Sequence, residues 1–272
     1  MRQSGKVRQR GFTLVELALV MGIVALLLGG LMVPVGRMLE QKANATTQAT
    51  LETAQQAIWG FALLNQRLPC PDTGSDGQEG ARNAAGACIA FTDPAGASRG
   101  HLPWAALGIS GVDAWGSRLR YAVATPLVSN INKTSINATN LIVKCTTLTS
   151  PDIPGCLSGG VAVTLASNAA FVVYSHGKNQ RGAVSADGLT TFPAPTPTTT
   201  NQDENANQPE QANTFEVVDP TTPFSPENSR RIFVFRSRTD ATSVAGEFDD
   251  LMVWMPAPLL AAKLVAAGVW QP

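Results

Sequence analysis

The chain has 272 residues, enough for one large domain or two small ones with a core. Its formal charge is zero, but the first ten residues hold four basic residues and no acid, which leaves 16 basic against 20 acidic side chains beyond them. That balance argues against nucleic-acid binding by the body of the chain. Only 15% of residues are charged, which is typical of an exported, loop-rich β domain rather than a cytosolic enzyme.

An apolar segment follows the basic leader. Residues 12–33 contain two clearly polar side chains, Thr13 and Glu16. At about 1.5 Å per residue a helix of this length measures roughly 33 Å, against about 30 Å for a hydrocarbon core. We therefore expect a membrane-spanning helix over 12–35, with a cytoplasmic N-terminus because the preceding residues are basic. No small-residue cleavage site follows the run, so we expect the span to be retained.

Glu16 is the anomaly in this segment. A carboxylate at the centre of a membrane helix costs about 2.5–3.5 kcal/mol on insertion scales and therefore indicates function, unless it lies near the headgroups and snorkels. The string "RGFTLVEL" (residues 10–17), with a basic leader before it and an apolar helix after it, resembles the class III signal of type IV pilins and type II secretion pseudopilins. The resemblance covers the leader and the first helix.

The resemblance implies processing and assembly. A prepilin peptidase would cleave between Gly11 and Phe12, and Phe12 would be N-methylated. Glu16 would pair with the α-ammonium of a neighbouring subunit's Phe12 inside an apolar helix bundle, where unpaired charges are costly. The implied partners are other pilin or pseudopilin subunits, the prepilin peptidase, the inner-membrane assembly platform and the membrane. The implied location is single-pass in the inner membrane with a periplasmic head, then a periplasmic pseudopilus or an extracellular pilus.

The rest of the chain predicts an α+β fold. Apolar residues at three- and four-residue steps extend the helix to about Asn65, and 68–111 indicates mainly loop. Strand-like runs occur at Leu119–Ala124, Asn140–Thr146, Gly160–Ala166, Ala170–Ser175 and Arg231–Arg236, the last of them expected to be interior, and a short helix is expected over Ala257–Gly268. We expect a long helix packed on an antiparallel, pilin-like head, in these regions: leader 1–11, membrane or filament-core helix 12–35, amphipathic continuation 36–66, and globular head 67–272 with a low-complexity surface excursion at 190–214.

All four cysteines lie on the side predicted to be extracytoplasmic. An even count in an oxidising compartment indicates two disulfides, although four cysteines allow three connectivities. We expect the pairs nearest in sequence, Cys70–Cys88 and Cys145–Cys156. A metal site is the alternative, but CxxC spacing and an adjacent histidine are both missing.

Three strings in the head resemble the major pseudopilin of type II secretion: "DAWGSRLRYAV" (113–123), "FVVYSHGKNQRGA" (171–183) and "FDDLMVW" (248–254). That family binds one calcium ion in its loops, although this chain has a less acidic loop at 176–179. Calcium needs six to eight oxygen ligands. The resemblance implies a calcium site at Asp249, Asp250 and Asn179, with the acids of 203–205 as further candidates; solvated turn residues are the alternative.

We expect no enzyme, because the chain has no common catalytic or nucleotide-binding motif. The predicted function is a structural subunit, a minor pilin or pseudopilin. The alternative is a tip-located pilin that binds a surface, DNA or a secreted substrate. The basic string "SRRIFVFRSR" is the one feature that favours nucleic acid, and basic residues flanking a buried strand explain it equally well, so we do not expect nucleic acid as a partner.

Overall fold

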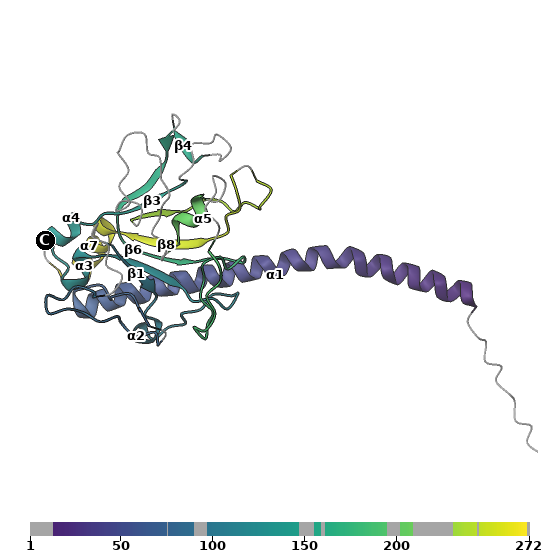
Figure 1. Ribbon diagram of the computed structural model, residues 1–272, viewed down its shortest axis with the longest axis horizontal. Coiled ribbons are helices and arrows are strands. Elements are labelled where there is room, and N and C mark those ends of the chain that lie inside the picture. Colours follow the sequence, from purple (N-terminus) through teal and green to yellow (C-terminus); the bar gives the residue numbers. More distant parts are fainter. Residues whose placement is uncertain are drawn as a thin grey trace, which may run out of the picture. The chain divides into compact units, whose positions relative to one another are not determined.

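The computed structural model describes residues 13–74, 76–89, 97–146, 155–158, 161–194, 202–208, 231–243 and 245–270, with backbone only at 29–34, 158, 161, 202 and 205. The chain separates into two compact units, residues 1–43 and residues 44–272. Each is treated by itself below. Together the described elements form an α+β protein with one long helix and a mainly antiparallel sheet (Figure 1).

Helix α1 runs from Leu14 to Asn65 and contributes to both units. Its C-terminal part packs into the head through a stripe of fully buried side chains, Leu51, Ala54, Ile58 and Ala62. Steps of three and four residues place these side chains on one helix face, as the sequence pattern predicted. Within the residues that the structure describes, no helix combines the length and the apolar character needed to cross a membrane.

The main sheet follows the order β1-β2-β6-β3-β7, with β8 also paired to β6. Its strands are β1 (Ala97–His101), β2 (Arg120–Ala124), β3 (Leu141–Lys144), β6 (Thr164–Ser175), β7 (Ile232–Val234) and β8 (Leu251–Pro256). All pairings are antiparallel except the parallel pair β3 and β7. A two-stranded sheet joins β4 (Leu157–Ser158) to β5 (Val161–Ala162). The α+β class is therefore correct.

The sheet differs from the sequence prediction in three ways. Strand β6 is one element where two were predicted, because its first half is largely exposed and its second half buried, so the hydropathy pattern changes within one strand. Strands β1 and β8 were not predicted. Strand β7 was predicted to be interior, but it lies at one end of the sheet order. Its outer side is covered by Asn207, whose side-chain amide bonds both the N–H and the C=O of Val234.

Five shorter helices complete the described part: α2 (Trp104–Leu107), α3 (Pro126–Ser129), α4 (Lys133–Asn137), α5 (Gln202–Ala206) and α7 (Ala257–Ala266). Helix α7 matches the predicted C-terminal helix and buries Ala257, Leu260 and Leu264 on one face. The core between α1, α7 and the sheet is rich in aromatic side chains, and Tyr121, Phe171 and Tyr174 are essentially inaccessible to solvent.

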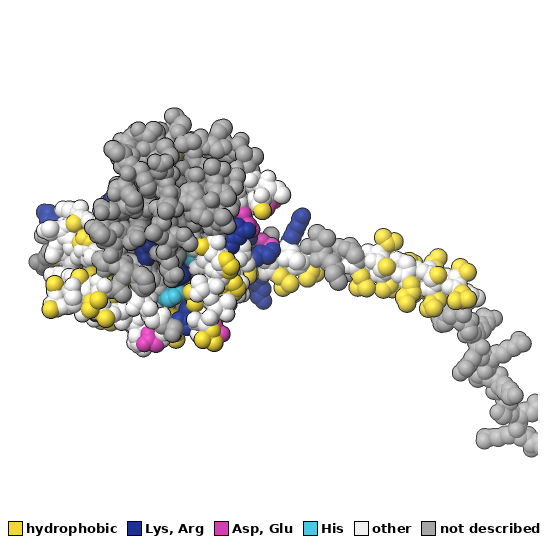
Figure 2. Space-filling view, viewed as in Figure 1, with side chains coloured by type: hydrophobic (Ala, Val, Ile, Leu, Met, Phe, Trp, Pro, Cys, Tyr) yellow, Lys and Arg dark blue, Asp and Glu magenta, His cyan; other side chains and the backbone are white. Residues whose placement is uncertain are grey.

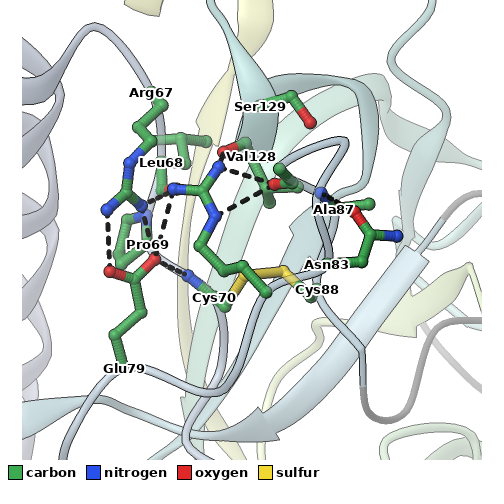
Figure 3. Close-up of a disulfide and its surroundings, with 12 residues drawn as sticks. Arg67, Leu68, Pro69, Cys70, Glu79, Asn83, Ala87, Cys88, Val128 and Ser129 are labelled. Carbon is green, nitrogen blue, oxygen red and sulfur yellow. Dashed lines mark hydrogen bonds and ion pairs between the residues drawn. A yellow bond between two sulfur atoms is a disulfide. The ribbon is translucent and has the colours of Figure 1, made fainter.

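Both cysteine pairs expected from the sequence are disulfide-bonded: Cys70–Cys88 and Cys145–Cys156. The first lies beside a small polar network (Figure 3). There the Glu79 carboxylate faces the guanidinium of Arg67 and accepts a hydrogen bond of 2.9 Å from the backbone N–H of Cys70. The network and the disulfide together fix the chain just after α1 ends.

Candidate functional site

A reciprocal pair of hydrogen bonds between Thr13 and Glu16 caps the N-terminal end of α1. The Glu16 N–H donates to Thr13 Oγ1 at 3.2 Å, and the Thr13 N–H donates to Glu16 Oε2 at 3.5 Å. Thr13 is the N-cap and Glu16 the third helical residue, so the pair forms a capping box. Glu16 therefore has a local role in beginning the helix. The predicted cleavage site, Gly11 and Phe12, lies outside the described residues.

The helix that follows this cap carries large exposed apolar side chains. Leu14 is 87% exposed and Leu26 79% exposed, and the same holds to a lesser degree for most large side chains up to Leu28. Figure 2 shows these hydrophobic side chains along the described N-terminal part of α1. A contiguous apolar surface of this kind is typical of a segment that packs against lipid or against other helices.

In the head, three buried carboxylates converge: Glu204 from α5, and Asp249 and Asp250 from the residues directly before β8. Each offers an oxygen that lies within 4.8 Å of the others. Three of their oxygens, Glu204 Oε2, Asp249 Oδ1 and Asp250 Oδ1, are buried without a hydrogen-bond partner. We call these residues the carboxylate cluster. Buried polar atoms normally have partners, so the cluster has the character of a binding site.

The register of β6 and β8 explains why distant segments meet here. Ser175 is paired with Leu251, so the antiparallel course places His176 next to Asp250. The chain then turns at Gly177, whose φ is +67° and where a Cβ would overlap the backbone oxygen of Asp249. Only glycine fits this close approach, because it tolerates positive φ and has no side chain.

Asn179 organises the cluster as a hydrogen-bond donor. Its backbone N–H donates to Asp249 Oδ2 at 2.9 Å, and its side-chain Nδ2 donates to Glu204 Oε1. Its Oδ1 accepts from the N–H of Arg181 at 3.0 Å. The sequence proposed Asn179 as an oxygen ligand beside Asp249 and Asp250; the structure brings all three together, with Glu204 as the third carboxylate and Asn179 supporting it.

Burial makes the charges of the cluster unfavourable. It raises the pKa of Asp249 to about 6, with the neighbouring Asp250 charge as a further cause. Burial likewise raises the pKa of Glu204, assisted by Asp250, and the pKa of Asp250 itself. A bound cation would stabilise the ionised form of these buried carboxylates.

The side chain of His176 lies beside the carboxylate cluster. It is buried, both ring nitrogens are without hydrogen-bond partners, and Nδ1 lies 3.8 Å from Asp250 Oδ1. Burial lowers its pKa to about 3, so the imidazole is neutral at physiological pH.

Ser175, the preceding residue, donates its hydroxyl to Asp113 at 2.6 Å rather than to the His176 ring. Asp113 also accepts from the N–H groups of Trp115 and Ser117, so the "DAWG" string forms a turn around the buried Asp113 carboxylate.

The segment 202–208 corrects two sequence interpretations. It falls in the predicted surface excursion, yet Asp203, Glu204, Asn207 and Gln208 are buried. Arg236, part of the basic string, points inward and donates from Nε to Asp203 Oδ2 at 2.7 Å. The scarcity of apolar residues in 190–214 predicted a surface segment, but residues 203–208 are held in the head by polar contacts instead of apolar ones.

The chain was compared with known protein families, curated proteins and solved structures. Residues 6–32 match the model of the prokaryotic N-terminal methylation motif. The chain therefore carries a prepilin signal of the kind found in type IV pilins and pseudopilins. The motif implies processing by a prepilin peptidase and assembly with other pilin subunits. No curated protein and no solved structure matches the chain.

Proposed function

We propose that the chain is a structural subunit, a minor pilin or pseudopilin, of a type IV pilus or a type II secretion pseudopilus. The observation that carries the proposal is the methylation motif at residues 6–32, which runs into a helix whose apolar side chains are exposed. In this proposal a filament core supplies apolar partners for these exposed side chains. A head larger than a plain pilin fold requires favours a minor subunit.

The proposed sequence of events starts in the inner membrane. Residues 12–35 hold the precursor there as a single span, with the N-terminus cytoplasmic and the head periplasmic. The peptidase cuts between Gly11 and Phe12 and the new amine is methylated. The assembly platform then moves the subunit into a filament, where the carboxylate of Glu16 meets the Phe12 ammonium of a neighbour.

Two measurements test this function. Mass spectrometry of the protein from cells with an active peptidase should give an N-terminus at Phe12 with one added methyl group. Sheared filaments should contain the chain as a trace component. A dominant band would instead indicate a major pilin, labelling only at filament ends would indicate a tip subunit, and absence from filaments would overturn the proposal.

A second proposed function of the head is cation binding at the carboxylate cluster. The partnerless oxygens of Glu204, Asp249 and Asp250 supply three carboxylate ligands within 4.8 Å of one another. Calcium prefers such oxygens and takes the remainder of its six to eight ligands from backbone carbonyls and water. Calorimetric titration with calcium tests the site, with Asp249→Asn as the expected loss-of-binding variant. Unchanged heats in the variant would place binding elsewhere.

A further inference from the structure

Residues 202–208 are here called the polar clasp, and the side chains that the structure describes in it, at 203, 204 and 206–208, are buried with almost no apolar anchor. Their sequence is "QDENANQ", in which Ala206 is the one apolar residue. Even so, Glu204 and Asn207 have no exposed surface and Gln208 only 2%. Burial of apolar area therefore contributes little to holding this segment, and polar contacts must do so.

Most of these polar contacts are complete. Asp203 accepts from Arg236 Nε at 2.7 Å and from Thr146 Oγ1 at 2.8 Å. Asn207 bonds the backbone of β7 and donates to Asp250 Oδ2 at 2.7 Å. Such contacts offset the cost of removing the groups from water, because each buried donor or acceptor has a partner.

Gln208, at the end of the clasp, is also held by specific contacts. Its Nε2 donates to the backbone oxygen of Arg181 at 3.0 Å. Its side chain also occupies the space that a Cβ at Gly182 would fill. These contacts with Arg181 and Gly182 fix the position of Gln208, the C-terminal residue of the clasp.

Glu204 is the exception. Its Oε1 accepts from Asn179, but its Oε2 has no partner, and the carboxylate faces Asp249 and Asp250. An oxygen that is buried without a partner is unfavourable, and among the described residues each of the three carboxylates has one such oxygen. His176, fully buried, lies against the same cluster with two further nitrogens that have no partner among the described residues. Of the clasp contacts that the structure describes, the one at Glu204 is therefore incomplete, and a bound cation would complete it.

We propose that a divalent cation in the carboxylate cluster closes the clasp: with the cation bound, residues 202–208 dock on the head, and without it the incomplete contact at Glu204 holds them less tightly. The inference rests on the proposed cation site and adds that one of its ligands comes from the excursion. The head surface around α5 then depends on the divalent cation concentration outside the inner membrane.

Hydrogen exchange measured on the full chain in detergent tests the clasp, with calcium compared against a chelator. Titration calorimetry on the same sample gives Kd independently. At a calcium concentration 100 times Kd, linkage limits the slowing of exchange at amides 203–208 to about 100-fold, and we expect at least tenfold. Amides of α1 between residues 51 and 62 should not change. Calcium binding without slower exchange at 203–208 would overturn the clasp and leave the cation site intact; no binding at all would overturn both.

The variant Glu204→Gln separates cation-linked docking from general damage. The amide has nearly the same shape and can still accept from Asn179, but it is a poorer ligand for a divalent cation, so calcium should slow exchange at 203–208 less than threefold in the variant, against at least tenfold in the wild type. Glu52→Gln makes the same chemical change at an exposed site on α1 and should behave as the wild type. Calcium that slows exchange as much in Glu204→Gln as in the wild type would contradict the mechanism.

Discussion

Arg236 and Asp203 form an ion pair in the interior of the head: Nε donates to Oδ2 at 2.7 Å, and their side chains are 0% and 1% exposed. Arg236 also donates to Thr239 Oγ1 at 2.7 Å and to the backbone oxygen of Ala245 at 2.9 Å, and its guanidinium lies over the ring of Phe248. One side chain therefore connects α5 with the segment that leads to the carboxylate cluster.

Removing Arg236 should be strongly destabilising. Arg236→Met leaves the Asp203 carboxylate buried and uncompensated, and we expect a loss of about 3–5 kcal/mol in the free energy of unfolding. Denaturant unfolding of the full chain in detergent measures it. Lys133→Gln, at an exposed position at the start of α4, should change stability by less than about 0.5 kcal/mol. Equal effects of the two substitutions would mean that the buried pair is not important for stability.

The disulfide Cys70–Cys88 should stabilise the head through its loop. The two residues are 18 apart in sequence, and closing a loop of about that length contributes roughly 3 kcal/mol in the chain-entropy model. The double variant Cys70→Ala/Cys88→Ala, which leaves no odd thiol from this pair, should therefore unfold at lower denaturant concentration. The disulfide Cys145–Cys156 closes a shorter loop, with a sequence separation of 11, so the double variant Cys145→Ala/Cys156→Ala is the matched comparison. A denaturation midpoint unchanged in both double variants would contradict the entropic account.

The partly buried side chain of His101 should make the stability of the head sensitive to acid. Burial, with the charge of Arg120 as the next cause, lowers its pKa to about 3, from about 6.5 in an unfolded chain. Between these pH values the unfolded chain binds more protons than the folded one, so stability falls as pH falls from about 6.5 and is unaffected above it.

Comparing the wild type with His101→Gln at pH 7 and pH 5 isolates this contribution. The slope for one proton is at most about 1.4 kcal/mol per pH unit. The variant should therefore lose clearly less stability on acidification than the wild type. Titration of the carboxylate cluster is common to both proteins and cancels in the difference. Parallel pH profiles would show that His101 is not held neutral in the folded state.

How much of this could be predicted from the sequence depends on the kind of contact. The prepilin signal was predicted from its motif, and most of the α1 stripe (Ala54, Ile58 and Ala62, but not Leu51) and both disulfides from local spacing. The continuity of strand β6, which was predicted as two strands, and the clasp were not predicted, because they are set by partners distant in sequence. Glu204 is the clearest case: it sits in a polar segment, and only its proximity to Asp249 and Asp250 distinguishes it from any solvated acid.

The capping box between Thr13 and Glu16 gives Glu16 a local role beside the proposed contact with a neighbour's Phe12, and the two roles can be separated. Glu16→Gln keeps an oxygen that can accept from the Thr13 N–H but removes the charge. Thr13→Ala keeps the charge but removes the Oγ1 that accepts from Glu16, at a cost of about 1 kcal/mol to the helix end.

If pairing between subunits requires the charge, Glu16→Gln should be processed and retained with the membrane but be at least tenfold depleted from sheared filaments. Thr13→Ala should enter filaments at close to the wild-type level. Quantitative immunoblots of the membrane and filament fractions, with the N-terminus checked by mass spectrometry, measure both effects. The reverse pattern would assign Glu16 to helix capping, since a neutral glutamine would then suffice and loss of the threonine hydroxyl would not be tolerated.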